Sequence, residues 1–191
     1  SNELLHALMR VLARERRQAG HAACLSVAEP AFGEYAVAGR AAGLEIRSVP
    51  GDALFRPDWD ALAAAPAGSA VIFANPGNPS GVFTPPEACA AAMDRRPDLV
   101  WIVDEAFIDY AGDGWSTSPA APAGPAVTDA SAGDPVSLLP LVPARPNWVV
   151  LRSLTKFYAV PGLRLGYAAT GADLARGLAA ELPVWNVNAF A

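Results

Sequence analysis

The residues that could do chemistry follow the apolar runs of the sequence. They are Glu29 and Phe32 after residues 24–28, Asn75 and Asn78 after 71–74, Asp104 and Glu105 after 100–103, and Arg152, Ser153, Thr155 and Lys156 after 148–151. In open parallel sheets, ligands bind beyond the carboxyl ends of the strands. A carboxylate, an amide, hydroxyl groups and an amine would then converge on one edge, ready to bind a small polar ligand.

Each of these signals is weak by itself. A lysine at a strand end is most often solvated, and an aspartate after a strand is usually a cap or turn residue. The segment NPGNPSG, residues 75–81, is most simply two consecutive turns, because Asn, Pro and Gly each favour turn geometry. Only the conjunction of these groups points to a site.

Alternating helices and strands must position them. Residues 3–18 carry leucines and valine at helical spacing, and Gly20 ends this pattern. The expected strands are 23–30, 44–50, 69–76, 99–106, 147–154 and 163–170, and the expected helices are 33–43, 57–65, 86–95 and 172–182, with a short helix in 136–142. Apolar strands alternating with helices indicate an α/β fold in which a mostly parallel sheet is sandwiched by helices.

The length of 191 residues and the 52% share of hydrophobic residues predict one globular domain over residues 1–191. Residues 112–134 are rich in Pro, Ala, Gly and Ser and are expected to form a flexible surface insertion within that domain. Both ends look cut, since the sequence opens without methionine and stops without a polar tail. We therefore expect a fragment, with Ser1 and Asn2 as a possible cloning remnant.

Composition argues against several classes of protein. The net charge is −5 and the basic residues are scattered, so no nucleic acid partner is expected. No apolar run reaches the roughly 18 to 20 residues that span a membrane, and no signal peptide is evident, so we expect a soluble cytoplasmic protein. Cys24 and Cys89 form no CxxC motif and are expected to be buried thiols, and no metal site is expected.

Three motifs then carry a family resemblance. In this order, NPGNPSG (75–81), VDEAFIDY (103–110) and SLTKFYAVPGLRLGY (153–167) resemble the fold-type I pyridoxal-phosphate enzymes of the class I/II aminotransferase superfamily. The resemblance covers nearly the whole chain. It implies pyridoxal 5'-phosphate as cofactor and the large domain of such an enzyme, with the small domain absent. A nucleotide-binding Rossmann domain is disfavoured, because no GxGxxG follows the first strand.

The resemblance assigns a role to Lys156, which would carry the cofactor as a Schiff base. This bond requires a neutral amine, whose pKa burial and nearby positive charge would lower. Arg164, eight residues further on, would supply part of that charge and bind the cofactor phosphate. Other phosphate ligands of the family match Ser153 and Thr155, together with the start of the first helix at Ser1 and Asn2.

The resemblance also assigns the ring contacts. Asp104 would pair with the pyridine nitrogen and keep the ring protonated, which makes it catalytic together with Lys156. Asn78 would bond the phenolic oxygen and Phe32 would stack on the ring. Phe107 departs from the pattern DEAY of many relatives, so the family's tyrosine contact to the phenolic oxygen is missing. Three further residues, Glu105, Tyr110 and Tyr158, are interpreted as packing or supporting positions.

Three sequence segments indicate which reaction the enzyme catalyses. The segments DEAFIDY, SLTKFYAVPGLRLGY and LPVWNVNAFA look more like the threonine-phosphate decarboxylases of cobalamin biosynthesis than the histidinol-phosphate aminotransferases. The resemblance therefore implies decarboxylation of L-threonine O-3-phosphate to (R)-1-amino-2-propanol phosphate, a small phosphorylated amino-acid substrate, by a homodimer. The alternatives are an aminotransferase of the histidinol-phosphate type and a cofactor-binding fragment that is catalytically incomplete. The arginine that binds the substrate carboxylate in the family belongs to the small domain.

Overall fold

A computed structural model describes residues 2–111, 136–184 and 186–187, and the structural statements below refer to these residues. Ser1 and the expected insertion at 112–134 lie outside them. The helices and strands are α1 (Asn2–Gln18), β1 (Cys24–Glu29), α2 (Glu34–Ala41), β2 (Glu45–Pro50), α3 (Trp59–Ala63), β3 (Ala70–Ala74), α4 (Pro86–Met93), β4 (Val100–Asp104), β5 (Trp148–Ser153), β6 (Gly166–Thr170) and α5 (Ala172–Glu181). Three 3-10 helices join them: η1 (Ile108–Tyr110), η3 (Leu139–Ala144) and η4 (Pro161–Leu163).

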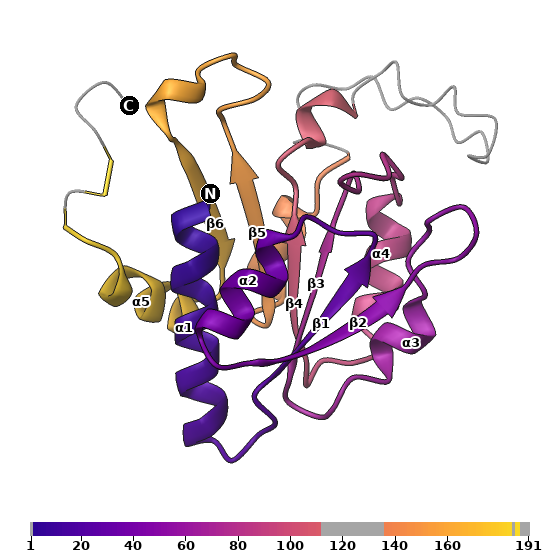
Figure 1. The fold of residues 1–191 in the computed structure, drawn as a ribbon, viewed down its shortest axis with the longest axis vertical. Helices are drawn as coiled ribbons and strands as arrows, with labels where there is room; N and C mark the ends of the chain where they lie inside the picture. Colours follow the sequence, from indigo (N-terminus) through magenta and orange to yellow (C-terminus); the bar gives the residue numbers. More distant parts are fainter. Residues whose placement is uncertain (1, 112–135, 185, 188–191) are drawn as a thin grey trace.

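The strands form one sheet in the order β2-β1-β3-β4-β5-β6, and its strands run side by side through the middle of the molecule (Figure 1). All neighbouring pairs among β1 to β5 are parallel, and β6 alone is antiparallel, paired with β5. The prediction of a mostly parallel α/β sheet is confirmed. Because β3, β4 and β5 are parallel, their carboxyl ends lie together at one edge.

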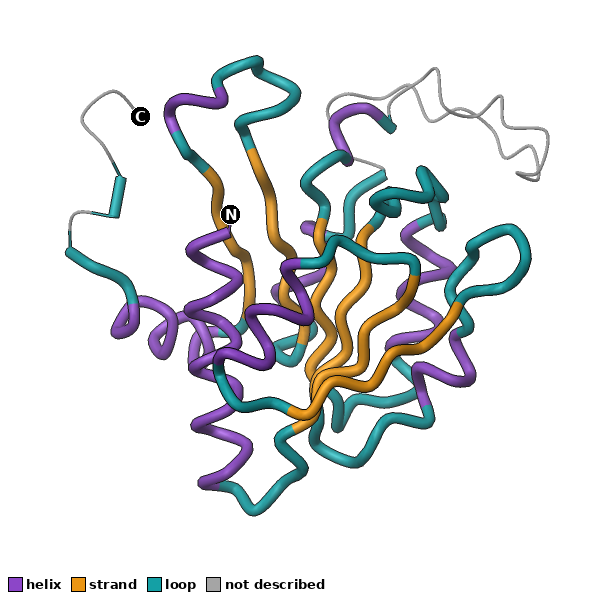
Figure 2. Tube along the Cα trace, viewed as in Figure 1, coloured by secondary structure: helices purple, strands orange, loops and turns teal. Residues whose placement is uncertain are grey.

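Helices cover both faces of the sheet (Figure 2). Val100 and Ile102 of β4 pack into a core with α1, α2 and α5, whereas Trp101 and Val103 pack into a second core with α3, α4 and η3. The alternation follows from the pleat of a strand, which points successive side chains to opposite faces. Both faces are therefore buried, as the continuous apolar strands require.

Helix α1 shows why the first segment is helical. Leu5, Leu8 and Leu12 are spaced at one and two turns, and all three are buried against the sheet. At the carboxyl end of the helix, the guanidinium of Arg17 donates a hydrogen bond to the carbonyl oxygen of Gly43 at 2.8 Å. The α1 residue Asn2, at the opposite end, is the first residue of the helix, and its side chain lines the site described below.

Two expected elements differ from the structure. The strand expected over 163–170 begins only at Gly166, because Pro161–Leu163 form η4 and Arg164 has a left-handed backbone with a φ of 52°. A residue in that conformation cannot continue an extended strand. The short helix expected in 136–142 is a 3-10 helix over Leu139–Ala144, which tolerates Pro143 over so short a length.

The structure also bears on the predictions about the cysteines and about membrane-spanning helices. Cys24 and Cys89 are both buried free thiols, as predicted. Within the described ranges, no helix has both the length and the hydropathy needed to cross a membrane.

Candidate active site

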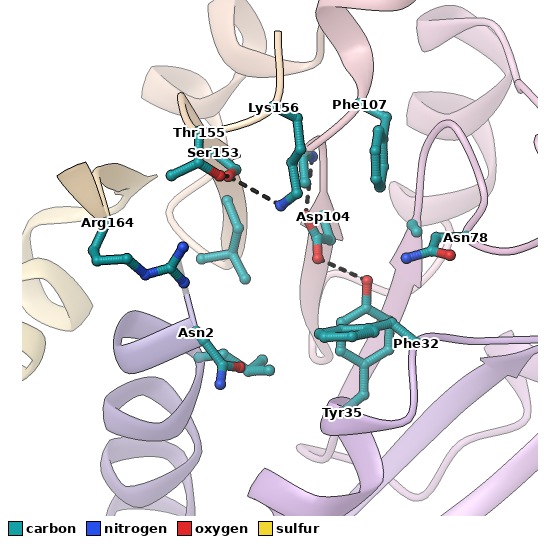
Figure 3. A pocket seen from close by; sticks show the side chains of 14 residues that line it. Asn2, Phe32, Tyr35, Asn78, Asp104, Phe107, Ser153, Thr155, Lys156 and Arg164 are labelled. Carbon is teal, nitrogen blue, oxygen red and sulfur yellow. Dashed lines mark hydrogen bonds between the residues drawn. The ribbon is translucent and has the colours of Figure 1, made fainter. Parts of the chain in front are cut away.

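The carboxyl ends of β3, β4 and β5 open into a pocket of about 250 Å³ beside the start of α1 (Figure 3). The structure brings eight of the nine sequence-predicted site residues to its wall: Asn2, Phe32, Asn78, Asp104, Ser153, Thr155, Lys156 and Arg164. The ninth, Ser1, lies outside the described residues. Residues far apart in the sequence thus meet at the edge that the parallel sheet predicts.

Strand pleating decides which polar residues face this pocket. Asp104 follows Val100 and Ile102 at even spacing, so it points to the same face as they do, toward α1 and α2. Ser153 stands in the same relation to Val149 and Leu151 of β5. The pocket therefore lies on the α1 side of the sheet.

The residues one position away point to the opposite face. Glu105 is fully buried there and accepts hydrogen bonds from the hydroxyl of Ser137 at 2.6 Å and from the backbone N–H of Leu138 at 2.7 Å. Arg152 donates to Glu105 at 3.1 Å and to Asp109 at 3.0 Å. We call Glu105, Arg152, Asp109 and Ser137 the buried ion cluster. Burial raises the pKa of Glu105 against the opposing effect of its hydrogen bonds from Ser137 and Leu138.

Asn75 also points away from the pocket. Its side-chain nitrogen donates to the carbonyl oxygen of Thr84 at 2.8 Å, and its side-chain oxygen accepts from the backbone N–H of Thr84 at 2.8 Å. Asn75 thus clamps the loop after β3, while Asn78 of the same motif lines the pocket. Of the two asparagines in the motif NPGNPSG, the first therefore stabilises the loop and the second is available to a ligand.

Lys156 lies beside two hydroxyl groups on the loop after β5. Its ammonium group donates to the hydroxyl oxygen of Ser153 at 3.0 Å, and the hydroxyl groups of Ser153 and Thr155 are 3.0 Å apart. The nitrogen of Lys156 is also 5.4 Å from the centre of the Phe107 ring, within reach of a cation–π interaction. The prediction that the Lys156 amine is buried is wrong for the part of the chain that the structure describes, where Lys156 is exposed. Phe157 and Tyr158, which follow it on the same loop, are also exposed, so this loop does not cover the amine.

Asp104 is held by two donors. The hydroxyl of Tyr35 donates to one carboxylate oxygen at 2.7 Å, and the backbone N–H of Ala106 donates to the other at 3.0 Å (Figure 3). Although the pocket leaves part of Asp104 accessible, protein atoms crowd the carboxyl group on its other sides. Desolvation therefore raises the pKa of Asp104, against the lowering effects of Tyr35, Ala106 and Lys156.

Tyr35 is the polar pocket residue that sequence reasoning missed. It is 1% exposed, and burial together with the negative charge of Asp104 raises its pKa well above the usual value. The available signal was its position three residues after Phe32, one helical turn into the segment that follows β1. The rings of Phe32 and Tyr35 meet edge to face with centres 5.7 Å apart.

Arg164 and Asn2 line the other end of the pocket. The left-handed backbone of Arg164 turns the chain between η4 and β6, and its guanidinium donates to the carbonyl oxygen of Pro161 at 3.0 Å. Figure 3 shows this guanidinium directed toward Asn2 and the start of α1. A guanidinium next to a helix N-terminus suits an anion, because free N–H groups and the helix dipole add to its charge.

The chemistry of this donor set fits pyridoxal phosphate. A carboxylate for the ring nitrogen lies at one side, an amine lies near it, and hydroxyl groups, a guanidinium and a helix N-terminus are available for the phosphate. The side chains of Asn2 and Asn78 line the pocket and make no hydrogen bond within the described part of the chain. Unused amide groups at a pocket wall are available to a ligand. Nowhere among the described residues do three or more His, Cys, Asp or Glu side chains gather as a metal site would require.

Comparisons with known proteins identify relatives of known name. The chain is 34% identical over 185 residues to a threonine-phosphate decarboxylase of Pseudomonas aeruginosa, covering 95% of this chain and 45% of that protein. It is 35% identical over 170 residues to a histidinol-phosphate aminotransferase of Oleidesulfovibrio alaskensis, covering 87% of this chain and 38% of that protein. The chain thus spans less than half the length of these relatives.

Solved structures show the same fold. The histidinol-phosphate aminotransferase of Clostridium acetobutylicum superposes with a TM-score of 0.74 at 21% identity, covering 99% of this chain and 49% of that one. The L-threonine-O-3-phosphate decarboxylase of Porphyromonas gingivalis superposes with a TM-score of 0.69, also at 21% identity and with the same shares covered. The family model of the class I and II aminotransferases matches residues 7–187. The chain therefore belongs to the class I and II aminotransferases, a family of pyridoxal-phosphate-dependent enzymes.

Proposed function

We propose that residues 1–191 are the cofactor-binding large domain of an enzyme that decarboxylates L-threonine O-3-phosphate to (R)-1-amino-2-propanol phosphate in cobalamin biosynthesis. In this proposal Lys156 carries pyridoxal phosphate and Asp104 binds its ring nitrogen. Substrate-binding groups from a small domain and from a second subunit complete the site.

One observation carries the cofactor assignment. Of the 14 lysine and arginine residues in the chain, only Lys156 is a lysine, and it lies in the pocket with Asp104. Arginine keeps its proton at any physiological pH, whereas a lysine can lose its proton and act as a nucleophile. The chain uses arginine for every other basic side chain and lysine at the one position where this chemistry needs an amine.

The residues divide the work of binding and proton transfer. When bound, pyridoxal phosphate supplies an electron sink for the bonds at the α-carbon of the substrate. Asp104 keeps the ring nitrogen protonated, because an adjacent carboxylate favours the cationic form of that nitrogen. Ser153 holds the Lys156 amine at the pocket wall, from which the amine can deliver or accept a proton.

Phosphate binding falls to the other end of the pocket. Arg164, Ser153 and Thr155 offer a guanidinium and two hydroxyl groups, and the first N–H groups of α1 add to them. Phe107 has no hydroxyl group to offer, so the amide of Asn78 is the side-chain partner of the ring's phenolic oxygen. Phe32, 40% exposed at the pocket mouth, is available to stack on the ring.

Decarboxylation is preferred over transamination on two grounds. The segment DEAFIDY carries phenylalanine at position 107, and the terminal segment LPVWNVNAFA also resembles the decarboxylases. Coverage does not separate the two reactions, because the alignment with the threonine-phosphate decarboxylase of Salmonella typhimurium covers 86% of the chain and the alignment with the Oleidesulfovibrio aminotransferase covers 87%. Because the identities are nearly equal, transamination of the histidinol-phosphate type is the second candidate.

Borohydride reduction followed by peptide mass mapping tests the cofactor assignment. Reduction fixes pyridoxal phosphate on the amine to which it is bound, and the chain offers Lys156 and one terminal amine. We expect the label on Lys156 and no label on the corresponding peptide of Lys156→Ala. A label confined to the terminal amine, or no label in the wild-type protein, would refute the assignment.

A product assay separates the reactions. The full-length protein is incubated with L-threonine O-3-phosphate and with histidinol phosphate plus 2-oxoglutarate in parallel. Release of carbon dioxide from the first substrate supports the decarboxylase, and formation of glutamate from the second mixture supports the aminotransferase. If Lys156 is labelled but neither product forms, both reactions are refuted for these substrates.

The surface around the pocket supports a proposal for the assembly. Tyr110, Phe157 and Tyr158 form a chain of ring contacts that begins at Phe107 of the pocket wall, and they are 48%, 47% and 57% exposed. Such a cluster of exposed aromatic side chains is typical of a protein interface. We propose a homodimer that covers this cluster, in a cytoplasmic enzyme, with residues 112–134 as a surface insertion.

A further inference from the structure

A buried tyrosine holds the carboxylate that the proposed function assigns to the ring nitrogen. We infer that Tyr35 is a positioning residue: its hydroxyl group orients the Asp104 carboxylate and keeps it ionised toward the pocket. The inference rests on the proposed function, because it gives Tyr35 a role through Asp104.

The geometry leaves the carboxylate one open side. Tyr35 reaches one oxygen of Asp104 at 2.7 Å from the first turn of α2, and the N–H of Ala106 reaches the other oxygen at 3.0 Å. Each oxygen therefore has one donor within the protein and one lone pair for a further partner. In Figure 3 the Tyr35 hydroxyl points at Asp104 from the side of α2, and the remaining side of the carboxylate faces the pocket.

The hydrogen bond also opposes the effect of burial on charge. Desolvation favours the neutral form of Asp104, and a neutral carboxyl group would not stabilise a cationic ring nitrogen. Tyr35 is the side-chain donor to Asp104 among the described residues, and Lys156 is the side chain whose positive charge acts on it. Lys156 is exposed, so solvent screens its charge, whereas the Tyr35 contact is buried.

The role can be removed without removing the ring. Tyr35 packs edge to face against Phe32, and a phenylalanine at position 35 would keep that contact while losing only the hydroxyl group. Tyr167, which is 38% exposed and lies outside the pocket wall, provides a matched substitution of the same kind. A comparison of the two variants isolates the hydroxyl group that contacts Asp104.

A double-mutant cycle on the full-length enzyme tests the inference. The dissociation constant of pyridoxal phosphate is measured by visible absorption for the wild type, Tyr35→Phe, Asp104→Asn and the double variant. We expect Tyr35→Phe to weaken binding about 10-fold, as loss of a hydrogen bond to a charged group would. In the Asp104→Asn background the same change should alter binding less than about 2-fold, and Tyr167→Phe should leave it unchanged.

The outcomes distinguish failure of the role of Tyr35 from failure of the proposed function. Equal losses in both backgrounds, or no loss in either, would overturn the role of Tyr35 while leaving the proposed function in place. If the wild-type protein binds no cofactor on Lys156, the proposed function fails and the inference fails with it. Weak binding by Tyr167→Phe as well would show a nonspecific effect and count against the inference.

A second measurement does not depend on folding of Tyr35→Phe. Ultraviolet titration of the cofactor-free full-length protein follows ionisation of tyrosine in the wild type and in Asp104→Asn. We expect one phenol to ionise at lower pH in Asp104→Asn, because the negative charge that opposes its ionisation is gone. Identical titration curves would count against an interaction between the Tyr35 phenol and the Asp104 carboxylate.

Discussion

Glu105→Gln should destabilise the protein strongly although it changes few atoms. The Glu105 side chain is 0% exposed and the Arg152 side chain is 9% exposed, and their nearest atoms are 3.1 Å apart. A glutamine oxygen can replace one carboxylate oxygen and accept from the N–H of Leu138. Its NH₂ group would then face the guanidinium of Arg152, donor against donor. Breaking a buried ion pair from one side costs about 3–5 kcal/mol.

The structure favours the lower end of that range. Arg152 keeps Asp109 as a partner at 3.0 Å, so its charge is not left without compensation. We therefore expect Glu105→Gln to lower the free energy of unfolding by about 3 kcal/mol, measured by urea denaturation of the cofactor-free protein near pH 7. The matched control is Asp60→Asn, which removes a 2.7 Å pair with Arg95 whose side chains are 85% and 53% exposed.

Burial is the difference between the two variants. An exposed pair contributes about 0.2–1 kcal/mol, so Asp60→Asn should have a small effect. Equal losses for Glu105→Gln and Asp60→Asn would refute the reasoning, because the buried pair would then be no stronger than a surface pair.

Three further changes have defined outcomes. Burial raises the pKa of Asp104 in the folded state, so the folded protein binds a proton more tightly than the unfolded chain and loses stability as pH rises from about 4 through that raised value. In urea denaturation, the stability of Asp104→Asn relative to wild type should therefore increase with pH over this window, and a constant difference would contradict the shift. Arg164→Ala should weaken pyridoxal phosphate binding at least about 10-fold in absorption titrations, whereas exposed Arg176→Ala should not. Gly171→Ala should lower stability by about 1–3 kcal/mol in the same denaturation assay, because a Cβ there would lie 2.6 Å from the carbonyl oxygen of Pro146, and full stability would show that the backbone adjusts.

Much of the fold could be predicted because the sequence is regular where the sheet is buried. The strand at β4 is continuously apolar up to Asp104, so its end was visible as the first polar residue. The leucines of α1 recur at helical spacing, which fixed the helix and its buried face. Parallel strands then required that their polar carboxyl-end residues gather at one edge, and the structure has them there.

The remaining features depend on tertiary contacts that no local pattern specifies. In the sequence, Tyr35 fits the pattern of a residue on the buried side of a helix, and nothing local marks its hydroxyl group as functional. The contact of that hydroxyl group with Asp104 arises because α2 packs next to the end of β4. The exposure of Lys156 depends on what covers the pocket mouth. The start of β6 depends on the left-handed turn at Arg164, a conformation that arginine rarely adopts and that its residue type does not announce.

Side-chain alternation at the ends of β3, β4 and β5 distinguishes residues that face the pocket from residues that face away from it. The period of two along β3, β4 and β5 assigns Ala74, Asp104 and Ser153 to one face, and it assigns Asn75, Glu105 and Arg152 to the other. The first set lines the pocket, and the second set makes hydrogen bonds within the protein. Alternation alone therefore separates candidate ligand-binding residues from structural ones among neighbours in the sequence.

This separation has an energetic meaning. The buried ion cluster is closed, since Glu105 has three donors and Arg152 has two carboxylates, so its polar groups are satisfied without a ligand. The carboxylate of Asp104 has fewer hydrogen-bond partners, and burial raises its pKa. The raised pKa corresponds to a loss of folding stability when this carboxyl group is ionised at the pocket. A cationic ring nitrogen would supply the missing partner. Substitutions in the buried ion cluster should therefore lower the stability of the fold without the Asp104-dependent loss of cofactor affinity expected for Tyr35→Phe. This difference is expected even though the cluster residues and the pocket residues are only one position apart along the same strands.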